Sequence, residues 1–128
     1  MGKTLAEKIL SDKSGADARA NDIVISPVDL AFVQDTTGPL TLRLFREAGF
    51  EHLANPAHTV LFMDHAAPSP VRQLSTDHVF IREFGRESGC IVSEVGDGVC
   101  HQIVAERYAR PWDVVVGADS HSVTAGAL

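Results

Sequence analysis

A chain of 128 residues, 45% of them hydrophobic, fits one globular domain with a buried core. Its net charge of −6, without any Lys/Arg-rich block, argues against nucleic acids and anionic membranes as partners. The opening residues are too polar for a signal peptide, no apolar run reaches membrane-spanning length, and two cysteines are too few for a disulfide framework. The sequence therefore predicts a cytoplasmic protein.

The first third of the sequence predicts a helix, a loop and a strand. Thr4 and Glu7 have the spacing of a capping box, which predicts a short helix that ends before Gly15. Small and polar residues up to Asn21 are typical of a surface loop. The apolar segment 22–26 then predicts a first strand, which a proline closes.

The middle third predicts strands that alternate with helices. The apolar stretch 28–37 ends in polar residues, and a helix with proline in its first turn is predicted over 38–49. A second buried strand is predicted over 59–63. Ser69-Pro70 is expected to cap the next helix, which ends at about position 84.

The last third repeats this alternation. A brief strand is predicted over 91–93, and a glycine turn leads into a helix over 99–106. Arg110-Pro111 breaks that helix before a last strand over 113–116. Strands alternating with helices predict an α/β fold, with a parallel or mixed sheet flanked by helices, in a single domain over 1–128.

Polar groups follow three of the apolar segments. They are Gln34-Asp35, Asp64-His65 and Asp119-Ser120-His121, while His101 follows a glycine turn near a helix start. Because parallel strands bring their carboxyl ends to one edge of a sheet, we expect these groups to meet there. An imidazole beside a carboxylate is suited to proton transfer, since the acid fixes the tautomer and favours the charged ring.

Each of these groups also has a structural interpretation. His65 suits a turn that is hydrogen bonded to backbone, and Asp119 or Ser120 can cap a helix. A three-histidine zinc site and a serine nucleophile stay open as alternatives, although the sequence has no HExxH-like pair and no GxSxG elbow. The remaining candidates are expected to be surface or helix-face histidines (His52, His58, His78), turn or surface acids (Asp29, Asp77, Asp97) and small core residues (Cys90, Cys100).

Taken together, four motifs are similar to those of the aconitase superfamily, in its order and approximate spacing. They are Gln-Asp-Thr-Thr-Gly at 34–38, Asp-His at 64–65, Gly-x-x-His-Gln-x-x-x-Glu at 98–106 and Gly-Ala-Asp-Ser-His-Ser at 117–122. The first ten residues also resemble the start of the 3-isopropylmalate dehydratase large-subunit and homoaconitase branches. The resemblance covers essentially the whole chain.

The resemblance implies a hydro-lyase that dehydrates and rehydrates a hydroxy-di- or tricarboxylate. A [4Fe-4S] cluster acts as the Lewis acid in the family, and an imidazole donates the proton that turns the leaving hydroxide into water. The implied substrate-binding residues are Gln34 and Ser120, with Ser120 at a substrate carboxylate, and Glu106 is implied as an acid behind the site. The implied catalytic residues are Asp64, His65, His101, Asp119 and His121.

The departures from the family pattern concern the cluster and the substrate. The three cluster cysteines of the family have no counterpart in this chain, because Cys90 and Cys100 match none of them. The substrate-binding arginines and the serine base belong to later domains of the family. Gln34 favours an aconitase- or homoaconitase-like branch, whereas Thr124 favours the isopropylmalate or homoaconitate side, and the substrate stays open.

We therefore expect the N-terminal portion of a hydro-lyase, of the 3-isopropylmalate dehydratase large-subunit kind, that is inactive by itself. Its partners would be the remaining large-subunit domains or a small subunit. The alternative is a short subunit that docks onto a separate cluster-bearing chain. A sheet cut after Val116 would expose apolar faces, which predicts a homo-oligomer or local disorder near Leu128.

Overall fold

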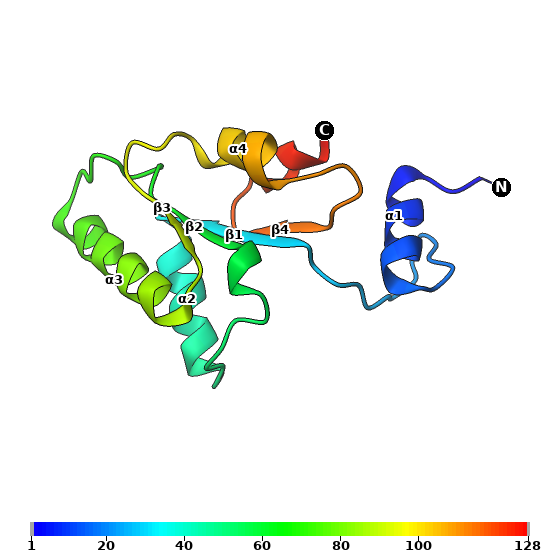
Figure 1. Cartoon of the computed structure of the whole chain (residues 1–128), viewed down its shortest axis with the longest axis horizontal. Coiled ribbons are helices and arrows are strands. Elements are labelled where there is room, and N and C mark those ends of the chain that lie inside the picture. Colours follow the sequence, from blue (N-terminus) through cyan, green and yellow to red (C-terminus); the bar gives the residue numbers. More distant parts are fainter. Residues whose placement is uncertain (1, 128) are drawn as a thin grey trace.

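A single parallel sheet lies at the centre of the computed structural model, which describes residues 2–127 (Figure 1). The strands follow the spatial order β3-β2-β1-β4, and all three neighbouring pairs are parallel. Their bounds are β1 Leu30–Gln34, β2 Thr59–Phe62, β3 Ile91–Ser93 and β4 Val115–Gly117. The expected α/β fold is confirmed, and the sheet is wholly parallel.

Helices cover both faces of this sheet (Figure 1). One face carries α2 (Gly38–Glu47) and α3 (Arg72–Ser88). The other carries α4 (Cys100–Ile103), the π-helical turn η2 (Val104–Tyr108) and the 3-10 helix η3 (Ser122–Ala127), and a short η1 (Pro56–His58) leads into β2. No helix within residues 2–127 is long and apolar enough to span a membrane.

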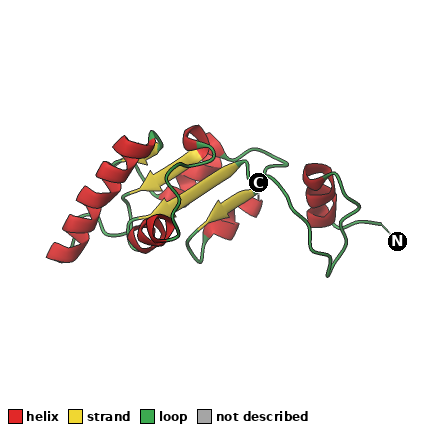
Figure 2. Cartoon of the chain, turned by 90° about the horizontal axis from the view of Figure 1, so that it is seen from below, coloured by secondary structure: helices red, strands yellow, loops and turns green. Residues whose placement is uncertain are grey.

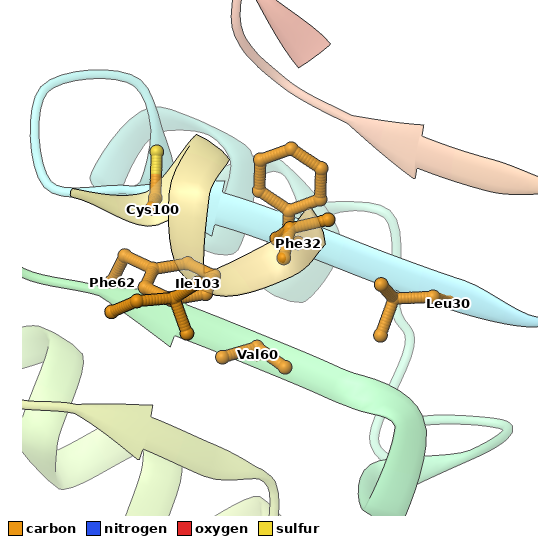
Figure 3. Close-up of a cluster of buried hydrophobic side chains, with 7 residues drawn as sticks. Leu30, Phe32, Val60, Phe62, Cys100 and Ile103 are labelled. Carbon is orange, nitrogen blue, oxygen red and sulfur yellow. The ribbon is translucent and has the colours of Figure 1, made fainter. Parts of the chain in front are cut away.

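Strand β2 divides the core into two clusters, because successive side chains of a strand point to opposite faces. Val60 and Phe62 face the α4 side, where they join the cluster of Figure 3, whereas Leu61 and Met63 pack on the α2–α3 side. All four side chains are at most 1% exposed. A strand that is buried on both faces has a continuous apolar sequence, which is why the position of β2 was predictable.

Helix α1 (Leu5–Ser14) lies to one side of the sheet, beyond β4 (Figures 1 and 2). The capping box is present, because the side chain of Thr4 accepts from the backbone of Glu7 and the reverse bond is also made. Gly15 ends the helix with a φ of 70°, in the left-handed region that glycine tolerates best. The predicted first helix is therefore confirmed at both ends.

The predicted strand over 22–26 is wrong. The segment forms no ladder, and Ile23 and Ile25 are 99% and 92% exposed. Strand β1 is paired on both sides, by β2 and β4, and the segment that precedes it stays outside the sheet. It links α1 to the sheet instead (Figure 2).

Several helix boundaries also differ from the prediction. Helix α3 begins at Arg72 without a side-chain cap, and the Ser69 hydroxyl lies 3.4 Å from Nδ1 of His78 instead. The helix continues past position 84 to Ser88, where Gly89 closes it. The predicted 99–106 helix is divided into α4 and the wider turn η2. The predicted disorder near Leu128 concerns a residue outside the described range.

Candidate active site

The polar groups that follow the strands meet at the carboxyl edge of the sheet, as the sequence predicts. The parallel register places Gln34 of β1 beside Phe62 of β2, and Phe32 of β1 beside Gly117 of β4. The next residues of each strand therefore emerge together at that edge. Helix α4, packed above the same edge, adds His101 near its own start.

The carboxylate of Asp119 lies at the centre of this group. Its Oδ1 is 3.0 Å from Nε2 of His101, and its Oδ2 is 3.8 Å from Nε2 of His65. The backbone N–H of His121 donates to Oδ1 at 2.8 Å, and the amide of Gln34 donates to Oδ2 at 3.4 Å. The His121 hydrogen bond, with help from Gln34 and the two imidazoles, keeps the pKa of Asp119 below its usual range against the effect of burial. Asp119 is therefore a fixed negative charge between two imidazoles.

A second carboxylate, Asp64, fixes the opposite side of His65. Its Oδ1 lies 2.9 Å from Nδ1 of His65, and its Oδ2 accepts the backbone N–H of Cys100 at 2.7 Å. Burial favours the neutral acid, but the hydrogen bonds from Cys100 and His65 outweigh it, and the pKa of Asp64 is lowered. Burial likewise lowers the pKa of His65, but the Asp64 hydrogen bond and the charges of Asp64 and Asp119 raise it on balance. His65 thus holds its proton more firmly than a free imidazole does.

His101 stands between the other two imidazoles. Its ring centre is 5.8 Å from that of His65 and 5.8 Å from that of His121, and its ring meets the edge of Phe32. The His101–Asp119 contact is short, yet its angle does not suit a hydrogen bond, so this buried Nε2 has no hydrogen-bond partner within residues 2–127. A buried donor without a partner is costly, and a ligand atom at this position would satisfy it.

The remaining predicted residues are exposed. Ser120 and His121 are exposed, with Oγ of Ser120 3.3 Å from Nδ1 of His121. Gly117 allows this turn, since a Cβ there would lie 2.7 Å from the ring of Phe32 and would also strike the Ser122 hydroxyl. Glu106 is exposed on η2 and accepts a hydrogen bond from Gln102.

Comparisons with known proteins identify the family of this chain. Residues 7–128 match the aconitase family (aconitate hydratase). The chain belongs to the aconitase family. It is 55% identical to the 3-isopropylmalate dehydratase large subunit of Elusimicrobium minutum. It is also 53% identical to the 3-isopropylmalate dehydratase large subunit 1 of Thermotoga maritima and 51% identical to the large subunit 2 of Archaeoglobus fulgidus. Each match covers all of this chain but only 31%, 30% and 30% of the relative. The chain thus spans about a third of the length of these relatives, and the family resemblance is confirmed.

Beneath the site, this aconitase-family chain has a buried pair that the sequence reasoning missed. Asp35 is completely buried, and its Oδ2 accepts Nε2–H of His78 at 2.7 Å. His78 was expected as a surface or helix-face histidine; it lies on a face of α3, but that face is buried and His78 is only 6% exposed. The available signal was its spacing, because His78 lies four residues after Leu74 and three before Ile81, on the apolar side of α3. Asp77, expected as a turn or surface acid, is also buried and pairs with Arg43.

The two cysteines do not suit a family iron–sulfur cluster. Cys100 is fully buried, and burial together with nearby Asp64 raises the pKa of its thiol to about 12. Cys90 packs in the cluster on the other face of the sheet. Both are core residues, as predicted. Because they lie on opposite faces of the sheet, the two cysteines cannot ligate one cluster together.

Two sets of three side chains around His101 bring metal-ligand atoms within 4.8 Å of one another. One set is His101, Asp119 and His121, and the other is His65, Cys100 and His101. The zinc alternative drawn from the sequence required three histidines together. Within the described residues, the three imidazoles form a row around His101 and do not make one such set.

Proposed function

We propose that this chain is the N-terminal part of a hydro-lyase of the 3-isopropylmalate dehydratase large-subunit kind, and that it supplies the proton-transferring side of the active site. The observation that carries the proposal is the position of His65 between two ionised carboxylates. Asp64 orients Nδ1 at 2.9 Å, and Asp119 lies 3.8 Å from Nε2. The raised pKa of His65 favours its protonated form, as a general acid requires.

In the proposed reaction, Nε2–H of His65 donates its proton to the hydroxyl group that leaves the substrate, which departs as water. Asp64 remains ionised and stabilises the imidazolium through Nδ1, and after the transfer it holds the neutral ring in the same orientation. In the reverse hydration, the neutral imidazole takes a proton from the incoming water. The proton on carbon would be removed by a base from the remaining domains.

The substrate would be a hydroxy-di- or tricarboxylate held at the rim of this site. Ser120 is exposed there and can donate to a carboxylate. Gln34 is 2% exposed, and its Oε1 accepts from the backbone and hydroxyl of Thr36. It gives one amide N–H to Asp119 and keeps a second one for a ligand. His101 and His121 complete the rim, and Glu106 would support the α4–η2 helix behind them.

When bound, a [4Fe-4S] cluster would supply Lewis-acid activation of the hydroxyl, with its cysteines on the remaining large-subunit domains. Those domains or a small subunit are the proposed partners. Homo-oligomer formation and a cytoplasmic location stay predictions. The names of the similar large subunits favour 3-isopropylmalate over citrate or homocitrate as the substrate.

The proposal is tested with a chimeric enzyme. The matching N-terminal segment of the Thermotoga maritima large subunit 1 is replaced by these 128 residues, and the iron–sulfur cluster is reconstituted. Formation of the unsaturated acid from 3-isopropylmalate, citrate and homocitrate is then followed by ultraviolet absorbance. We expect turnover of 3-isopropylmalate by the chimera and none by the 128-residue chain alone. An inactive, correctly folded chimera beside an active unmodified subunit would refute the proposed function.

A further inference from the structure

A buried acid beneath the site holds the turn that carries His65. Asp35 follows β1 directly, and its side chain is 0% exposed. Its Oδ1 accepts the backbone N–H of His65 at 3.0 Å, and its Oδ2 accepts the backbone N–H of Ala66 at 3.0 Å. One carboxylate therefore fixes two successive peptide groups of the turn that follows β2.

The same carboxylate is anchored from α3, on the face of the sheet opposite α4. Nε2–H of His78 donates to Oδ2 of Asp35 at 2.7 Å, and the Ser69 hydroxyl lies 3.4 Å from Nδ1 of His78. Both side chains are almost completely excluded from water, since that of His78 is 7% exposed and that of Asp35 is 0% exposed. A hydrogen bond between two such buried groups is electrostatically strong, and its geometry is costly to change.

The position of this pair relative to His65 gives it more than a packing role. The backbone of His65 is held by Asp35, while its imidazole meets Asp64 on one side and faces Asp119 on the other. A shift of the 65–66 peptide groups would move the ring away from both carboxylates. Neither Asp35 nor His78 contacts the open side of the site, so neither needs to touch a substrate.

We propose that Asp35 and His78 form a positioning pair that fixes the orientation of His65 for proton transfer. The expected effect on kcat rests on the proposed function, whereas the expected effect on the orientation of His65 does not. Misplacing a reacting group by about 1 Å can cost on the order of 100-fold in rate. Loss of the pair should therefore lower kcat, while KM changes little because the rim residues stay in place.

The first test measures His65 in the 128-residue chain by nuclear magnetic resonance, in His78→Leu and His78→Gln variants. His78→Leu removes the donor to Asp35, whereas the amide of Gln can replace it. We expect His78→Leu to weaken the His65–Asp64 hydrogen bond, seen in the Nδ1 proton signal, and to lower the pKa of His65. His78→Gln should retain both. An unchanged His65–Asp64 bond in a folded His78→Leu variant would overturn the inference.

The His65–Asp64 hydrogen bond separates positioning from a simple charge effect. The groups that face His65 are Asp64, Asp119 and Asp35, with His101 and Cys100 beside them. Because a negative charge on Asp35 itself favours protonated His65, a fall in the pKa of His65 supports the inference only if the His65–Asp64 hydrogen bond weakens with it. A fall with an unchanged hydrogen bond, or a rise in the pKa, would overturn the inference.

If His78→Leu does not fold, Asp35→Asn replaces it as the test variant, because Asn keeps the size of the buried side chain. The matched control is Asp77→Asn. Asp77 is also a buried acid of this region, but it pairs with Arg43 and Gln73 and not with the His65 turn. We expect the His65–Asp64 bond to weaken in Asp35→Asn and to persist in Asp77→Asn. Equal effects of the two variants would mean that general destabilisation is responsible, and would overturn the inference.

Kinetics in the chimeric enzyme complete the test. Asp35→Asn should lower kcat on the order of 10- to 100-fold with little change in KM, and Asp77→Asn should leave both near the parent values. A parent chimera without activity would refute the proposed function alone, since the resonance measurements still decide the positioning role. An active Asp35→Asn chimera with unchanged kcat would refute the positioning role alone.

Discussion

The carboxyl edge of the sheet and the amino-terminal arm, residues 2–28, are held in opposite ways. At the edge, hydrogen bonds join residues that are distant in the sequence, such as His65 to Asp35 and Gln34 to Asp119. In the arm they are mainly internal, such as those between Glu7 and the backbone of Thr4 and Ala20. The edge therefore has one geometry fixed from several elements, whereas the shape of the arm depends on its own residues.

Few polar contacts connect the arm to the sheet. Lys13 pairs with Asp29 at 2.8 Å, and Trp112 donates to Asp12 at 3.1 Å. Helix α1 contributes no buried residue, and a groove lined by Ile9, Leu10 and β4 separates it from the sheet. Reacting groups need a fixed geometry, so the difference matches a site at the edge and none in the arm.

The largest expected effect tests the edge through its proposed acid. His65→Asn removes the ionisable proton donor but retains a polar side chain of similar size. We expect kcat of the chimeric enzyme to fall by about 10²- to 10⁴-fold, the usual contribution of general acid–base catalysis. His52→Asn, at an exposed loop position, is the control and should leave kcat unchanged. If the two variants behaved alike, His65 would not be the acid.

The next effect concerns the turn that positions Asp119. Gly117→Ala places a Cβ against the ring of Phe32 and the Ser122 hydroxyl, so strand and turn must move apart. We expect the free energy of unfolding to fall by about 1–3 kcal/mol, as for other overpacked positions. Urea denaturation measures it. Gly126→Ala, where nothing lies within 4 Å of the added Cβ, is the matched control and should change much less.

What the sequence could predict follows the same division. Strand β2 was predicted because burial on both faces imposes an apolar run, whereas β1 was expected only as part of the apolar stretch 28–37. Three of the polar groups were placed because they follow apolar segments, and His101 because it follows a glycine turn. The pairing of Asp35 with His78 was not predictable, since it joins residues 43 positions apart across different elements. The false strand over 22–26 has the local composition of a strand, but it pairs with no strand of the sheet.

The pH dependence of stability sharpens the comparison at His65. The pKa of His65 is raised in the folded state, so protonated His65 stabilises the fold. This contribution to the free energy of unfolding is complete below the unfolded pKa of about 6.5 and is lost as pH rises through the folded pKa. Asp64→Asn removes the main favourable partner. We expect the difference in unfolding free energy between parent and variant to be larger at about pH 6 than at about pH 8. Equal differences at both values would show that Asp64 does not raise the pKa of His65.

The smallest effect is expected in the arm. Ile23 and Ile25 are 99% and 92% exposed, so replacing either with serine removes almost no buried apolar area. Each variant should change the free energy of unfolding by less than about 0.5 kcal/mol, whereas Phe62→Ala in the core should cost about 3–5 kcal/mol.

Self-association gives these two isoleucines a second readout, because large exposed apolar side chains favour contact between molecules. If the 128-residue chain forms the predicted homo-oligomer through its arm, the double variant with serine at both positions should shift sedimentation toward the monomer without changing unfolding. If the double variant instead lost more than about 1.5 kcal/mol of unfolding free energy in the monomer, the two isoleucines would be buried, since only buried side chains give effects of that size. The arm would then be packed like the edge, and the contrast between the two regions would fail.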